Sequence, residues 1–158
     1  DRKYNAAIGD VVATSDHEAG QVDIVFIMAD GSKPGAAMIS GLQAYLSGKT
    51  IRPMTDKLTV KAPEEVTYSI NLTYYINRSD SARAVAIQAA VAQAVEEYKT
   101  WQRTIGRDIN PSKLTAMVIA AGAKRVVVSA PAYTKVAATS VANLSAAASV
   151  TYGGLEDD

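Results

Sequence analysis

The chain contains 158 residues, of which 48% are hydrophobic, and its 16 basic residues balance 16 acidic residues. A chain of this length buries enough apolar surface to fold without a disulfide or a metal. The absence of cysteine excludes disulfide bonds, thiolate nucleophiles and zinc–cysteine sites. The balanced charge provides no overall field that favours nucleic acid or an anionic membrane. No apolar run reaches the ~20 residues of a membrane-spanning helix, so we expect neither a nucleic-acid partner nor membrane insertion.

Strand and helix signals alternate in the first part of the chain. A short strand is predicted at residues 11–14, and a buried strand rich in β-branched residues at residues 22–29. A helix is predicted to begin near Pro34 and to end at Gly48, because proline suits a first helical turn and apolar residues then recur at spacings of three and four. A further strand is expected at residues 58–61.

The clearest strand covers residues 66–77, where apolar and polar residues alternate strictly. This alternation places one face on a core and the other in water or against a partner, as in antiparallel sheets. A strand of this length would span about 40 Å, so a bend or bulge is expected. The polar face is uncharged and includes Asn71, Thr73 and Tyr75. It is interpreted equally well as a solvent face and as a contact surface.

Helices follow this strand. A long helix is predicted at residues 81–103, with Ser79 or Asp80 as its cap. A shorter helix is predicted to begin at Asn110-Pro111, with asparagine as the cap and proline in the first turn, and to end at Gly122. Strands are predicted at residues 124–131 and 149–152, and the stretch between them shows no clear pattern.

These elements predict an α+β fold. We expect a two-layer sandwich, in which a mixed sheet with a long antiparallel strand is covered by one long and two shorter helices. The order of elements divides the chain into an N-terminal lobe, residues 1–63 (strand, helix, strand), and a C-terminal lobe, residues 64–158 (long strand, long helix, short helix, strands). The N-terminus lacks both an initiator methionine and the apolar core of a signal peptide, so we expect a fragment of a longer protein.

No residue pattern predicts a catalytic, cofactor-binding or metal site. His17, the single histidine, lies in an acidic turn, and partners for metal binding or acid–base work would have to come from elsewhere in the fold. The sequence has no G-x-S-x-G motif to present a nucleophilic serine. The loop at residues 30–35 lies where a nucleotide loop would lie, but it lacks the glycine spacing of a phosphate-binding motif. We therefore expect no enzyme activity, no cofactor and no metal.

Charge is distributed unevenly along the chain. Basic residues gather between residues 99 and 125, where they include Arg103, Arg107 and Lys113, whereas residues 10–30 are acidic. The cations are interpreted either as favourable charges at the C-terminal end of the long helix or as one of two complementary faces for assembly. A nucleic-acid patch is disfavoured, because this stretch has one aromatic residue and no stacking pattern.

A set of short motifs keeps a fixed order along residues 11–154. The motifs are Gly20-Gln21-Val22-Asp23-Ile24-Val25 with Asp30-Gly31, residues 39–46, 51–56 and 58–63, the long strand and helix, Gly106-Arg107-Asp108-Ile109, and residues 125–131. This ordered set resembles the baseplate J-like family of contractile-tailed bacteriophages and related injection particles. Ala121-Gly122-Ala123 departs mildly from the Pro-Gly-Val that the family commonly has at this place.

The resemblance implies a structural wedge component of the tail baseplate, assembled in the cytoplasm of the bacterial host. The resemblance leaves open whether the particle is a phage, a prophage remnant or a bacteriocin. Its implied partners are other wedge and hub proteins and copies of itself, and it would help to transmit the trigger for sheath contraction. The residues expected at interfaces are Asn71, Thr73, Tyr75, Arg103, Arg107 and Lys113. The alternative hypothesis is a small-ligand-binding or regulatory α+β domain with a pocket between its sheet and helices.

Overall fold

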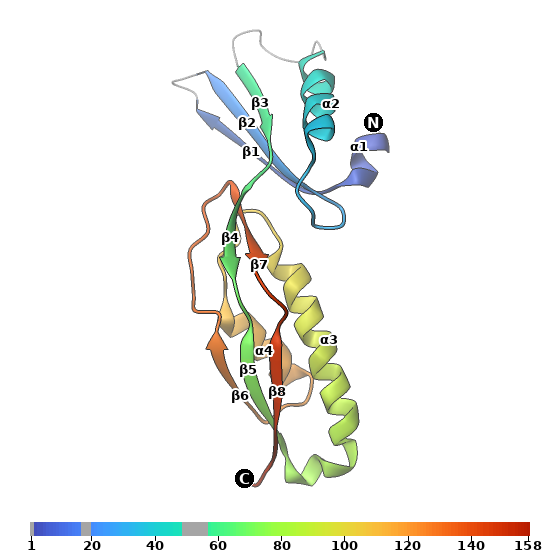
Figure 1. Ribbon diagram of the computed structural model, residues 1–158, viewed down its shortest axis with the longest axis vertical. Coiled ribbons are helices and arrows are strands. Elements are labelled where there is room, and N and C mark those ends of the chain that lie inside the picture. The colour runs from blue at the N-terminus through green and yellow to red at the C-terminus, as the bar shows by residue number, and fades with distance from the viewer. Residues whose placement is uncertain (1, 17–19, 49–56) are drawn as a thin grey trace.

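The computed structural model describes residues 2–16, 20–48 and 57–158, and it shows two parts joined end to end (Figure 1). The N-terminal part, which comprises the described residues up to residue 61, has a three-stranded sheet with the order β1-β2-β3. Strand β2 pairs antiparallel with β1 and parallel with β3. Its elements are α1 (Arg2–Ala7), β1 (Ile8–Asp16), β2 (Gln21–Met28), α2 (Ala36–Ser47) and β3 (Lys57–Lys61).

The predicted helix and its apolar face are confirmed as α2, which covers one side of this sheet. Leu42 of α2 packs with Phe26 of β2 and Val60 of β3 in a separate core. Gln43 completes the packing, since its Oε1 accepts the Val60 N–H at 2.8 Å and its Nε2 donates to the Leu58 carbonyl at 3.0 Å. The side chain therefore satisfies backbone groups of β3 that have no neighbouring strand among the described residues.

The C-terminal part begins at residue 64 and contains a two-stranded sheet, β4-β7, and a three-stranded sheet, β6-β5-β8. Helices α3 and α4 pack on one face of these strands, where Tyr98 and Leu114 meet Leu72 and Tyr74 in the largest core (Figure 1). Its elements are β4 (Glu64–Tyr68), β5 (Asn71–Asn77), the 3₁₀ helix η1 (Arg78–Arg83), α3 (Ala84–Gln102), α4 (Pro111–Ala120), β6 (Arg125–Ala130), β7 (Ser140–Leu144) and β8 (Ser149–Glu156).

The predicted long strand is present as β4 and β5, with the expected interruption at Ser69 and Ile70. Its buried side continues through the interruption, because Tyr68, Ile70 and Leu72 are all at most 8% exposed. The antiparallel assignment is correct for the pairing with β6 and wrong for the other neighbours. Strand β4 runs parallel to β7, and β5 runs parallel to β8. Alternation reports which face is buried, and it does not report the direction of the neighbouring strand.

Two predictions about the helix starts had opposite outcomes. The Asn110 side chain accepts the Ser112 N–H at 3.0 Å and caps α4, as predicted. The cap predicted at Ser79 or Asp80 is wrong. A 3₁₀ turn precedes α3, and the Asn77 side chain caps that turn by accepting the Ser79 N–H at 3.0 Å. The prediction failed because η1 and α3 follow each other directly, and the sequence pattern does not distinguish the 3₁₀ turn from the α-helix.

The predicted α+β class is confirmed, whereas the arrangement of layers differs from the prediction. The strands form three sheets and not one mixed sheet, and α2 covers a different sheet from α3 and α4. The helices lie on different sheets because the apolar face of α2 packs against Phe26 and Val60. No described residue of α2 belongs to the core beneath α3. Strand β7, which the sequence did not indicate, extends the C-terminal sheets beside β4.

Candidate functional site

The sheet β6-β5-β8 has one face covered by helices and one open face, which carries the polar residues of β5. Thr73 lies opposite Val127 of β6 and opposite Thr151 of β8, so the three side chains form a row across the sheet. Asn71 lies opposite Ser149 of β8. Val127 is 45% exposed, which makes the β6 end of this row apolar. The rows form an uncharged surface, and we call it the open sheet face.

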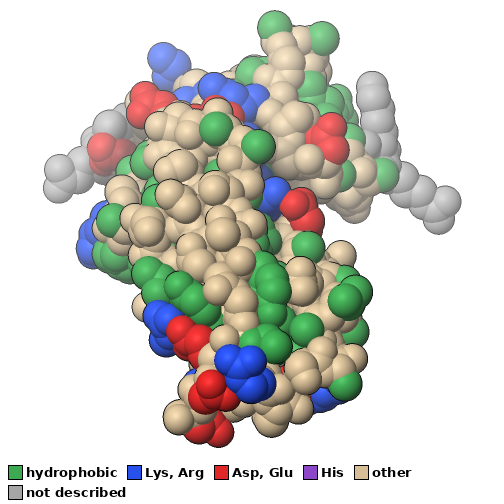
Figure 2. Space-filling model, turned by 60° about the horizontal axis from the view of Figure 1, so that its bottom comes forward, with side chains coloured by type: hydrophobic (Ala, Val, Ile, Leu, Met, Phe, Trp, Pro, Cys, Tyr) green, Lys and Arg blue, Asp and Glu red, His purple; other side chains and the backbone are tan. Residues whose placement is uncertain are grey.

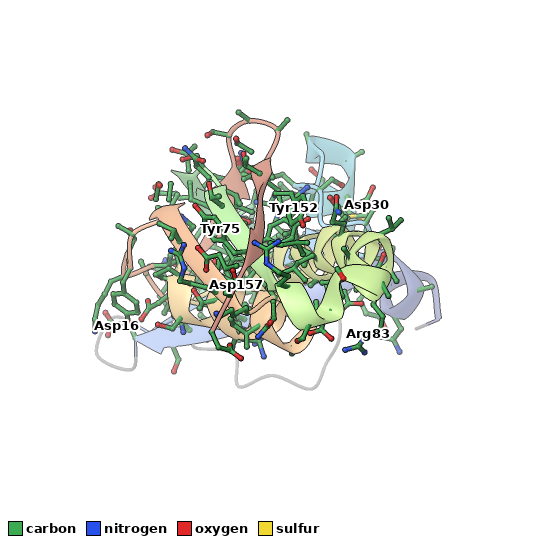
Figure 3. The ribbon with its side chains drawn as sticks, turned by 90° about the horizontal axis from the view of Figure 1, so that it is seen from below. Asp16, Asp30, Tyr75, Arg83, Tyr152 and Asp157 are labelled. Carbon is green, nitrogen blue, oxygen red and sulfur yellow. The ribbon has the colours of Figure 1, made fainter. Side chains whose placement is uncertain are left out.

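Tyr75 closes the lower end of the open sheet face. Its ring lies against Gly153 of β8, where a Cβ atom would come within 2.4 Å of Tyr75 Cε1. The Arg125 guanidinium stacks over the same ring at 4.0 Å from the centroid. Figure 3 shows Tyr75 on the side of the strands away from α3, whereas Tyr152 lies toward that helix, where it packs on the core. An aromatic ring over a strand glycine covers backbone that would otherwise be bare.

Charged groups at this end of the sheet are paired within the chain. Arg125 forms an ion pair with Glu156, in which Nε donates to Oε2 at 3.0 Å, and this hydrogen bond lowers the pKa of the Glu156 carboxyl. Arg78 pairs with Asp157 at 2.7 Å, and Lys124 pairs with Asp158 at 3.2 Å. Figure 2 shows charged side chains gathered at this lower end, with a largely uncharged surface above it. The open sheet face thus presents few free charges of its own.

Arg103 lies away from this face, at the junction between the two parts of the chain. Its Nε donates to the Gly31 carbonyl at 2.8 Å, its Nη1 to the Ala142 carbonyl at 2.9 Å, and its Nη2 to Glu65 Oε1 at 3.0 Å. The Arg103 side chain is 18% exposed. Its guanidinium is therefore engaged inside the chain.

Arg107 and Lys113 meet at a third place, the indole ring of Trp101. The Arg107 guanidinium lies 4.3 Å and the Lys113 ammonium 5.4 Å from the ring centroid. Arg107 is held there because its Nη1 donates to the Trp101 carbonyl at 2.6 Å. The quadrupole of the indole ring attracts both cations. The six predicted interface residues therefore form three groups: Asn71, Thr73 and Tyr75 on β5, Arg107 and Lys113 at Trp101, and Arg103 alone.

Sequence reasoning did not identify the neighbours of Thr73 and Tyr75, namely Val127, Thr151 and Gly153. The alternation of exposed and half-buried residues in β6 and β8 carries the corresponding signal. That signal assigns each residue to a face of its own strand. It does not say which strands are neighbours, and a shared surface depends on the pairing.

A cleft of about 630 Å³ lies between the two parts, lined by Asp10 and Asp30 on one side and by Lys99 and Arg103 on the other. Its charged groups have partners inside the chain. Asp10 Oδ2 accepts the Ile105 N–H at 2.9 Å, and Lys99 Nζ donates to Glu96 Oε1 at 2.6 Å. Asp30 Oδ1 accepts hydrogen bonds from the Ser32 hydroxyl and N–H, which lower the pKa of Asp30.

The part of the chain that the structure describes contains no group of three or more His, Asp or Glu side chains arranged to hold a metal ion. His17 lies outside the described residues. Among the described helices, none is both long enough and apolar enough to cross a membrane.

Two family models match successive segments of the chain. The Baseplate J-like central domain matches residues 5–62, and the Baseplate J-like protein C-terminal domain matches residues 68–151. The chain is also similar to Baseplate protein J of Escherichia phage P2, with 28% identity over 130 residues. That alignment covers 82% of this chain and 42% of the phage protein, so the chain spans less than half the length of this relative. The C-terminal model alone matches more than half of the chain, and the chain belongs to the baseplate J-like protein family.

Proposed function

We propose that this chain is a structural component of a contractile phage-tail baseplate, a wedge protein that acts through protein–protein packing and not through catalysis. The observation that carries the proposal is the open sheet face, an uncharged surface in a chain of the baseplate J-like family. The name of the P2 relative, Baseplate protein J, supports a place in the tail baseplate of the virion. Its partners would be other wedge and hub proteins and copies of itself, assembled in the host cytoplasm.

The composition of the open sheet face fits an interface. Charged residues are depleted at interface cores, whereas tyrosine is enriched there. Tyr75 is held over Gly153 by packing and under Arg125 by stacking, so little side-chain entropy remains to be lost when a partner binds. Arg107 and Lys113 at Trp101 would supply a second contact, with an acidic surface of the partner. Such a contact steers association more than it strengthens it.

We also propose that the chain divides into two domains between Pro63 and Glu64. Each part has its own buried core, and the two family models meet across this boundary, one ending at residue 62 and the other beginning at residue 68. A non-catalytic role is consistent with the cleft between the parts, because its charged groups are engaged inside the chain. For the same reason the small-ligand alternative has no specific observation in its favour.

The proposal is tested by co-expressing the chain with wedge and hub proteins of a contractile tail and measuring their association by pull-down and sedimentation. Thr73→Lys places a charge in the middle of the open sheet face and is expected to weaken association at least about tenfold, because an unpaired ammonium would be buried. Ala92→Lys adds the same charge at an exposed position of α3 and serves as the matched control. Equal binding by both variants, with native circular dichroism, would refute the role of the open sheet face.

A further inference from the structure

The two parts of the chain are connected once along the backbone, through Ala62 and Pro63 between β3 and β4. Each described sheet belongs entirely to one part, so no strand pairing fixes the parts to each other among the described residues. Each part also has its own core, built around Phe26 and Leu42 in one and around Tyr98 and Leu114 in the other. Units of this kind move relative to each other unless their shared interface is large and apolar.

The apolar contact between the parts is small. Val25 and Ile27 of β2 pack against Ile105 and Val141 of the C-terminal part, with Val12 at the margin. Phe26, which lies between Val25 and Ile27 in the strand, points to the opposite side and packs against α2. Strand β2 thus uses one face for its own core and the other for the junction. A few aliphatic side chains resist separation of the parts, but they do not define an angle between them, because apolar contact is non-directional.

Arg103 supplies the directional contact. Glu65 and the Ala142 carbonyl hold its guanidinium on the C-terminal side, while Nε reaches across to the Gly31 carbonyl at 2.8 Å. A planar guanidinium bound on three sides has one orientation, so the position of Gly31 is defined relative to α3. The acceptor, the Gly31 carbonyl, is itself held in place by a turn. Gly31 has a φ of 81°, and its N–H donates to the Met28 carbonyl at 2.9 Å in a tight turn.

A second hydrogen bond reinforces the first. Asp10 Oδ2 accepts the Ile105 N–H at 2.9 Å, two residues beyond Arg103. The register of β1 shifts between Ile8 and Asp10, and such a bulge commonly re-aims a side chain. The segment that follows α3 is therefore tied to the N-terminal part at two points, through Asp10 and through Gly31. Beside these ties the cleft of about 630 Å³ separates the two parts, which leaves space for movement.

We propose that Arg103 is a positioning residue, a latch that holds the two parts of this chain in one relative orientation, and that releasing it lets them rock about residues 62–63. The latch consists of Arg103 with Glu65, Ala142 and Gly31, and it is supported by Asp10 and Ile105. This inference rests on the junction alone and is independent of the baseplate role. Arg103, which the sequence predicts at an intermolecular surface, here connects two parts of the same chain.

The absence of cysteine makes the test direct, because two introduced cysteines are the sole attachment points for spin labels. Labels at Ser40→Cys on α2 and Ala92→Cys on α3, both exposed positions, report the distance between the parts by pulsed electron resonance. Arg103→Ala is expected to widen the distance distribution about twofold or more, and Arg103→Lys to widen it less, because an ammonium group keeps the charge but loses the planar fork. Arg83→Ala, which removes an exposed pair with Asp80 inside the C-terminal part, is the control and should leave the distribution unchanged.

An unchanged distribution in folded Arg103→Ala would overturn the proposal. If that variant fails to fold, Asp10→Ala tests the same junction without altering Arg103. It is expected to widen the distribution and to accelerate amide hydrogen exchange at Ile105 about tenfold, because that N–H loses its acceptor. A native distance distribution together with native exchange at Ile105 in Asp10→Ala would contradict the latch as well.

Discussion

Gln102 and Tyr98 lie one turn apart on α3, both are fully buried, and the Tyr98 hydroxyl donates a hydrogen bond to Gln102 Oε1 at 3.0 Å. The same oxygen accepts the Asn110 N–H at 3.1 Å, and Gln102 Nε2 donates to the Asp108 carbonyl at 2.9 Å. One buried amide therefore connects the end of α3 to the start of α4. No described buried side-chain nitrogen or oxygen in the molecule lacks a partner, and this network accounts for the most deeply buried of them.

Replacing Gln102 with methionine keeps the volume but removes these partners. The part-buried Asn110 N–H and Asp108 carbonyl would then lose their side-chain partner, so we expect a loss of about 2–4 kcal/mol in the free energy of unfolding. Urea denaturation measures this loss. Gln93→Met, at an exposed position of the same helix, is expected to change stability by less than about 0.5 kcal/mol, and similar losses in both variants would contradict the prediction.

Gly153→Ala tests the packing beneath Tyr75. The new methyl group would lie 2.4 Å from Tyr75 Cε1, so the ring must leave the strand and its stacking with Arg125 is lost. We expect a destabilisation of about 1–3 kcal/mol and a change in the Tyr75 ring resonances by NMR. Thr151→Ala, at an exposed position of the same strand, should leave those resonances in place. A Tyr75 ring that keeps its resonances in Gly153→Ala would show that the strand, and not the ring, moves.

The hydrogen bonds of the Asp108 carboxylate are expected to make the protein less stable at acid pH. Hydrogen bonds from the Tyr133 hydroxyl and the Val136 N–H hold the pKa of its carboxyl below 3.8. A carboxyl whose pKa is lower in the folded state stabilises the fold above its unfolded pKa and loses this contribution as the pH falls through the folded value. The melting temperature of the wild type should therefore fall more steeply than that of Asp108→Asn below about pH 4. If the melting temperatures of the two proteins fall in parallel with pH, Asp108 does not make this contribution to stability.

Two buried tyrosines, Tyr68 and Tyr98, are expected to make the protein less stable at alkaline pH. Burial raises the pKa of Tyr68 from 10.0 to about 12, and burial likewise raises the pKa of Tyr98. Because the neutral phenol is favoured in the folded state, its contribution is complete below pH 10.0 and is lost as the pH rises toward about 12. Tyrosinate absorbance should appear in two steps, the second coinciding with loss of circular dichroism. Tyr68→Phe should move that second step to higher pH, and an unmoved step would contradict the role of Tyr68.

The sequence by itself determined the local structure and the faces of its elements. Alternation located β5 and its buried side, and Asn110-Pro111 located the start of α4, because these signals depend on residues close together in the chain. It also indicated the α+β class, and the ordered motifs resembled the family to which the chain belongs. Strand β7 gave no signal, since its first three residues are all buried and no alternation marks them.

The tertiary structure alone decided which elements are neighbours. It placed β8 parallel and β6 antiparallel to β5, and so determined that Thr151 and Val127 share a face with Thr73. It also brought Arg103 to Gly31, although the two are 72 residues apart in the chain. Sequence patterns indicate on which side of its own helix or strand each residue lies. Strand pairing and junction contacts depend instead on which surfaces meet when distant segments fold together. For that reason the charge of Arg103 was evident in the sequence, and its place between the two parts was not.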